Sequence, residues 1–135
     1  MLVARNSMSS YGYSKKILLP FDEAVDRVKD AYAKSGFGIL CDIDVKEKFK
    51  EKLGIEYQNY RILGMCNPAR AHEALGADPE IGLLLPCNVI VYEKEDTVIV
   101  STVRPTALLG LVDDPVVAPI AGAVEELLIR SLNSA

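Results

Sequence analysis

Cys66, His72 and Cys87 are the residues of this sequence whose side chains are best suited to bind a metal or to react as nucleophiles. Thiolate and imidazole groups are ligands of Zn²⁺ and Cu(I), and either can be an axial ligand of haem. Their spacing, C-x5-H-x14-C, is not that of a zinc knuckle, and His72 is the only histidine. A metal site would therefore need a further ligand, such as Asp78 or a residue of a second subunit.

Cys66 has the clearest physical reason to be reactive. It follows an expected strand over 60–65 and directly precedes Asn67-Pro68, a pair typical of a helix start. The positive end of a helix dipole favours the thiolate, which is the reactive form of cysteine. Free cysteines are also often small buried side chains. Thiol chemistry and a packing role therefore both remain open for Cys66.

Cys87 and His72 have weaker support as site residues. Cys87 lies on an expected strand over 83–93, and the alternation of that strand directs its side chain toward the core. His72 falls at the border of the inward stripe of an expected helix over 68–75, a position typical of exposed or half-buried histidines. The three residues form one site only if the fold brings the ends of these elements together.

Two further residues are candidates for binding an anion. Arg61 can hold a carboxylate through two parallel hydrogen bonds, and Asn67 lies at the same expected strand-to-helix connection. An arginine on a strand can instead pair with a surface acid. A glycine-rich phosphate loop, a nucleophile elbow and a zinc-protease helix are all missing from the sequence.

Three functions remain after these exclusions. We expect a small ligand-binding or regulatory module without catalysis of its own, because few titratable residues are grouped along the chain. The first alternative is a thiol-redox, metal-binding or haem-binding protein that uses Cys66. The second is a homo-oligomer whose surface is its function, because the segments 107–112 and 116–123 are rich in apolar residues.

Composition narrows the class of protein. The 135 residues are 50% hydrophobic and 25% charged, as in a single globular domain. A formal charge of -4 with scattered charges, and with the lysines at 46–52 interleaved with Glu47 and Glu51, argues against nucleic acid as a partner. The sequence has no apolar run long enough to span a membrane and no visible secretory signal. Three cysteines, an odd number, indicate reduced thiols and a cytoplasmic location.

The periodicity of apolar residues predicts an α+β domain over 11–135 after a disordered tail at 1–10. We expect a mostly antiparallel, curved sheet of about five strands, with helices packed on one face. The expected strands span 11–19, 38–43, 60–65, 83–93 and 97–103. The expected helices span 21–35, 45–53, 68–75, 105–112 and 115–132, with Asp44, Asn67 and Gly36 among their caps.

Three blocks in the middle of the chain carry a family resemblance. They read YRILGMCNP at 60–68, AHEAL at 71–75 and GLLLPCNV at 82–89, and FDEAV at 21–25, GFGIL at 36–40 and DID at 42–44 extend the match. The sequence resembles the domain-of-unknown-function-302 family over nearly everything after residue 10. The resemblance implies an α+β fold with a curved antiparallel sheet, and it implies no catalytic residues. It also implies a hydroxyl side chain at the position of Cys41, so this cysteine is the weakest candidate.

Overall fold

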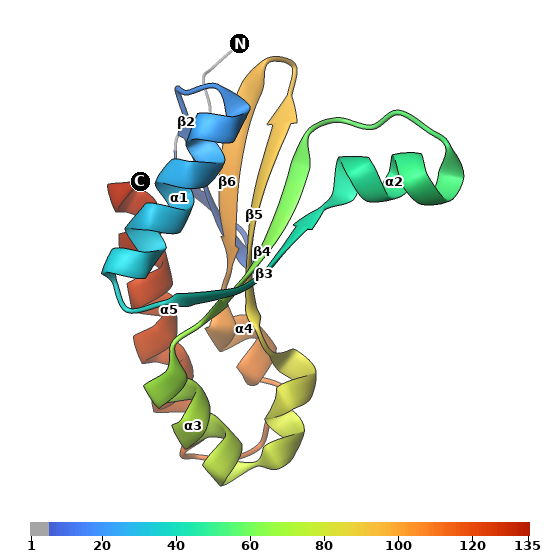
Figure 1. The fold of residues 1–135 in the computed structure, drawn as a ribbon. Coiled ribbons are helices and arrows are strands. Elements are labelled where there is room, and N and C mark those ends of the chain that lie inside the picture. The colour runs from blue at the N-terminus through green and yellow to red at the C-terminus, as the bar shows by residue number, and fades with distance from the viewer. Residues whose placement is uncertain (1–5) are drawn as a thin grey trace.

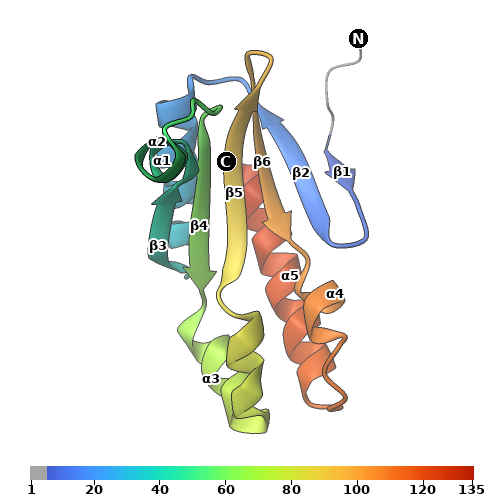
Figure 2. The same ribbon diagram turned by 90° about the vertical axis from the view of Figure 1, so that its right-hand side faces the viewer.

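The structure, a computed structural model, describes residues 6–135 as one antiparallel sheet with helices (Figures 1 and 2). Over these residues the sheet has six strands in the order β1-β2-β6-β5-β4-β3, and every neighbouring pair is antiparallel. The strands are β1 (Ser7–Met8), β2 (Gly12–Ile17), β3 (Gly38–Asp44), β4 (Tyr60–Cys66), β5 (Cys87–Lys94) and β6 (Thr97–Val103). The helices are α1 (Phe21–Lys34), α2 (Val45–Leu53), α3 (Pro68–Ala77), the 3-10 helix η1 (Pro79–Leu84), α4 (Pro105–Leu109) and α5 (Val117–Ser134). The predicted α+β class is confirmed.

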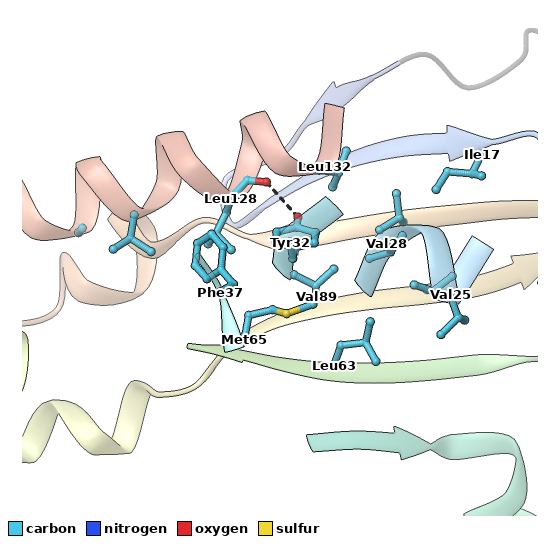
Figure 3. Packing of buried hydrophobic residues seen from close by; sticks show 14 of the residues in the cluster. Ile17, Val25, Val28, Tyr32, Phe37, Leu63, Met65, Val89, Leu128 and Leu132 are labelled. Atoms are coloured by element: carbon cyan, nitrogen blue, oxygen red, sulfur yellow. Dashed lines mark hydrogen bonds between the residues drawn. The ribbon is translucent and has the colours of Figure 1, made fainter. Parts of the chain in front are cut away.

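Helices α1 and α5 cover one face of the sheet, and the core lies between them and the central strands (Figures 1 and 3). Alternation along β5 places Val89 and Val91 on this covered face, where both are fully buried. The apolar stripe of α1 packs against them. Tyr32 on this stripe donates its hydroxyl proton to the carbonyl oxygen of Leu128 over 2.9 Å, which ties α1 to α5.

One end of the sheet carries a second group of helices. Strands β4 and β6 end there and β5 begins there, so α3, η1 and α4 all lie beyond the same end (Figures 1 and 2). Each of these helices has proline at its first or second position. Proline has a φ angle suited to a helix start, so these sites turn the chain from strand or loop into helix directly.

Helix α2 packs only lightly on the rest of the domain, with contacts to β4. It projects on the side of the sheet opposite α1 and α5 (Figure 1), and none of the residues 45–53 is buried. Asp44 caps its first turn by accepting a hydrogen bond from the amide of Glu47 over 3.0 Å, as the sequence predicts. Gly54 ends it in the left-handed conformation at a φ of 67°. Local signals therefore define α2 without any help from the core.

Several boundaries differ from the sequence-based expectation; the helix expected over 105–112, for example, ends at Leu109. The strand expected from residue 83 begins at Cys87, because Pro79–Leu84 forms η1, whose start is capped by Asp78 accepting from the amide of Glu80. At the other end, Ser7–Met8 pairs with β2, so part of the expected tail adds a strand to the sheet. The rest of that tail, 1–5, lies outside the described residues. No helix in the described part of the chain is both long and apolar enough to cross a membrane.

Candidate functional site

A cavity of about 330 Å³ opens at the end of the sheet where α3, η1, α4 and α5 converge. Apolar side chains form almost all of its wall, and only Asn67 and Arg70 bring hydrogen-bonding side chains of any strength. The lining residues are Phe37, Leu40, Met65, Cys66, Asn67, Arg70, Ala71, Ala74, Leu75, Gly82, Leu85, Pro86, Cys87, Pro105, Leu109, Ile120 and Val124. Ligand sites in proteins have this character, concave and apolar with few polar groups, and this one is at the small end of their usual volume range.

One face of α3 forms a wall of the cavity. Its contributing residues are Asn67, Arg70, Ala71, Ala74 and Leu75, a spacing of three and four that defines one side of a helix. The sequence predicts that the two alanines and Leu75 face inward. Ala74 is buried, whereas Leu75 lines the cavity but is 39% exposed. Because alanine ends at Cβ, this wall leaves space that a leucine would fill.

The polar groups of the cavity are at the start of α3. The side-chain oxygen of Asn67 accepts a hydrogen bond from the backbone amide of Arg70 over 3.3 Å, which caps the helix. The guanidinium of Arg70 lies 3.0 Å from the carboxylate of Glu73, and both side chains are about half exposed. Solvent competes with so exposed a pair, so Arg70 can exchange Glu73 for another anion at little cost.

Two of the predicted thiols meet in this cavity. Cys66 and Cys87 both line it, and all three cysteines are free. Burial, with a smaller contribution from the nearby Cys66 thiol, raises the pKa of Cys87 to about 11. Cys87 is therefore a neutral thiol at pH 7 and acts as an apolar part of the wall, the packing role that its strand parity predicts.

The remaining candidates for a metal site lie elsewhere. His72 is exposed and is not among the cavity residues, and the side chain of Asp78 caps η1. Cys41 is on β3, with its sulfur over Gly64. Within residues 6–135, no group of three or more histidine, cysteine, aspartate or glutamate side chains could hold a metal ion. The fold thus brings Cys66 and Cys87 together without His72.

Arg61 and Asn67, the predicted anion-binding pair, occupy opposite ends of β4. Arg61 donates two hydrogen bonds of 2.7 Å to the carboxylate of Asp42, and Lys29 of α1 lies 2.7 Å from the same group. These hydrogen bonds, that from Arg61 above all, lower the pKa of Asp42 from 3.8 to about 2. Of the two roles that the sequence allowed for Arg61, the structure shows pairing with a surface acid. This ion pair joins β4 to β3.

Arg70 is a hydrogen-bonding residue of the cavity that sequence reasoning missed. A usable signal was present, because Arg70 lies three positions after the Asn67 cap and therefore on the same side of α3. The walls from η1, α4 and α5 had no comparable signal. These segments reach the cavity only because antiparallel pairing brings the ends of β4, β5 and β6 to one edge.

Fold and cavity together define a small α+β domain with a sheet covered on one face and an apolar cavity at one end. Residues 13–135 match the family described as domain of unknown function DUF302, and the chain belongs to this family. A solved relative is the uncharacterized conserved DUF302 protein from Bacillus stearothermophilus, which is 30% identical. That similarity covers 93% of this chain and 98% of the relative, with a TM-score of 0.87. No protein with a curated description matches the chain.

Proposed function

We propose that this protein is a ligand-binding module that holds a small apolar molecule in the cavity between α3, η1, α4 and α5. The observation that carries the proposal is the cavity itself, about 330 Å³ with an almost wholly apolar wall. A dry engineered cavity of ~150 Å³ already binds benzene, so this cavity has room for a ligand about twice that size. Its walls come from seven separate elements, which are β3, β4, β5, α3, η1, α4 and α5.

The apolar wall also explains why the site suits binding better than catalysis. Cys87 is uncharged at neutral pH because its thiol is buried. Arg70 and Asn67 lie together at the start of α3, where they can orient a ligand by a polar end. The cavity therefore recognises its ligand by shape and by desolvation of apolar surface. The proposal also includes reduced cysteines and a cytoplasmic location for the protein.

Calorimetric titration with 1-octanol tests the proposal directly. An eight-carbon chain matches the apolar wall, and ligands of this size bind with Kd on the order of 10⁻⁴ M or tighter when most of their atoms are desolvated. We expect saturable one-to-one binding and a negative heat-capacity change, the signature of apolar burial.

Two matched variants on α3 decide whether binding occurs in the cavity. Ala71→Phe places a ring into the cavity, whereas Ala69→Phe adds the same ring to an exposed position of the same helix. We expect Ala71→Phe to weaken 1-octanol binding at least tenfold and Ala69→Phe to leave it within twofold of the original. Equal affinities in both variants, or no saturable binding by the unmodified protein, would reject the proposed function.

A further inference from the structure

The face of the sheet opposite α1 and α5 has an unusual composition for a solvated surface. We call this face the outer face. Its central positions are directly paired across neighbouring strands, and they are Tyr60, Tyr92 and Ile99 in one row and Ile43, Ile62 and Ile90 in the next. A one-sided antiparallel sheet usually alternates apolar and polar residues, with the polar ones facing water. Here the outer face is largely apolar at its centre, with Asn88, Thr97 and Ser101 as polar residues around these two rows.

No helix of the described residues packs across the outer face, which is turned toward the viewer in Figure 2. Its central side chains are half-buried by their neighbours in the sheet, and Ile43 is 41% exposed. Contiguous apolar surface of this kind marks a site of protein association. We propose that the outer face, together with α2, is the interface of a symmetric homodimer.

Helix α2 extends this apolar surface. A chain of ring contacts runs from Phe49 on α2 through Tyr57 to Tyr60 and Tyr92 on the sheet, with centroid distances of 5.0 to 6.4 Å. Leu53 at the end of α2 is 65% exposed. A helix with no buried residue gains little from its own domain, whereas a second copy packed on the outer face would cover its apolar side.

The charge distribution fits a second copy of the same chain. A two-fold axis through an interface brings each residue near the axis against its own equivalent, so like charges there are destabilising. From Tyr60 to Gly64, Asn88 to Tyr92 and Thr97 to Val103, the side chains on the outer face carry no charge. Lys16, which is paired with Ile99, and Lys94 border this uncharged surface, and α2 adds six charged residues of both signs beside it.

The size of the surface approaches what a small dimer interface needs. Four strands of about six residues have a projected area of roughly 400 Å² at ordinary strand spacing and rise. Side-chain relief and α2 increase the accessible area toward the roughly 600 Å² per partner that a small stable interface requires. A recess of about 150 Å³ bounded by Asn88, Ile90 and Val103 could receive a protruding side chain from the partner.

Light scattering after size exclusion tests the proposal over a concentration series. We expect a mass twice the 14.7 kDa of one chain, falling to one chain in the variant Ile90→Lys. Leu111→Lys is the control, because Leu111 is 77% exposed and lies in the 107–112 segment that the sequence had favoured for association. The control should stay dimeric.

The variant Leu53→Asp keeps the test decisive if Ile90→Lys fails to fold, since no residue of α2 is buried. We expect Leu53→Asp to weaken the dimer at least tenfold. A monomer at all concentrations, or a dimer that Leu53→Asp leaves unchanged, would overturn the proposal, and so would a dimer that only Leu111→Lys disrupts. The cavity lies at the end of the sheet, so 1-octanol binding should be unaffected by these variants, which keeps this test separate from that of the proposed function.

Discussion

Arg70 brings a positive charge to the start of α3, where an otherwise apolar cavity has its polar groups. Its guanidinium lies 3.0 Å from the carboxylate of Glu73, an exposed residue that does not line the cavity. A ligand with an anionic end therefore competes with Glu73 for Arg70. Changing Glu73, which lies outside the cavity wall, should therefore change the affinity of the cavity for anionic ligands.

Glu73→Gln should tighten binding of octanoate about two- to fivefold, because removing the carboxylate frees the guanidinium, and exposed pairs contribute less than about 1 kcal/mol. Arg70→Gln should weaken octanoate binding by a similar factor. Binding of 1-octanol should not change in either variant. Calorimetry with both ligands measures these effects, with Glu126→Gln in the remote Arg130 pair as control. Equal changes in the affinities for octanoate and 1-octanol would mean that Arg70 does not interact with the charge of the ligand.

Asp42 provides a pH-dependent contribution to stability. The pKa of its carboxyl is lowered from 3.8 to about 2 in the folded protein, chiefly by the hydrogen bonds from Arg61. Because the folded state releases this proton more readily, the stabilisation is fully present above about pH 4 and is lost as the pH falls through about 2. We expect Asp42→Asn to lower the free energy of unfolding by about 1 kcal/mol at pH 7, a value reduced for solvent screening.

Urea denaturation at pH 7 and at pH 2.5 measures this effect. The difference between Asp42→Asn and the original protein should shrink at the lower pH, where the carboxyl is partly protonated. Glu51→Gln serves as control, because Glu51 reaches its lysine partners only at 3.8 and 4.0 Å on the exposed surface of α2. A difference that stays constant with pH would show that the ion pair is not its origin.

At the scale of elements, the sequence predicted correctly those helix boundaries that are set by capping residues within the segment itself. Helix α2 was predicted from Val45 to Leu53 and has those bounds, because its Asp44 cap and Gly54 end act within the segment itself. The start of α3 at Asn67-Pro68 was predicted for the same reason. In contrast, Leu83 and Leu84 were expected in a strand and belong to η1. Periodicity does not separate a short apolar helix from a buried strand, and the Asp78-Pro79 start decided the outcome.

The isolation of α2 has a measurable consequence for its dynamics. A helix with no buried residue opens locally with a free energy near zero, so its amides should exchange far faster than those of α1 and α5. Dimerisation through the outer face would cover α2, so exchange should slow as the protein concentration increases. Hydrogen exchange read by mass spectrometry at two concentrations measures both effects. Slow exchange of α2 in the monomer would contradict the isolation that the structure shows.

At the scale of the whole molecule, the sheet order determines what the domain can do. Pairing in the order β1-β2-β6-β5-β4-β3 brings the connections after β4 and β6 and before β5 to one end, where they enclose the cavity. The sequence predicted Cys66, His72 and Cys87 as one candidate site. Cys66 and Cys87 line this cavity, whereas His72 does not. It did not predict the apolar cavity, because Leu109 and Val124 enter its wall from segments that only the tertiary fold brings near α3.

The most direct test of the ligand-binding proposal is to locate a bound ligand. Protein with ¹³C-labelled alanine methyl groups, mixed with 1-octanol, gives intermolecular nuclear Overhauser effects only between groups within about 5 to 6 Å of each other. We expect such contacts at Ala71 and Ala74, which line the cavity, and none at the exposed Ala69. Saturable binding of 1-octanol without contacts at Ala71 and Ala74 would contradict the ligand-binding proposal.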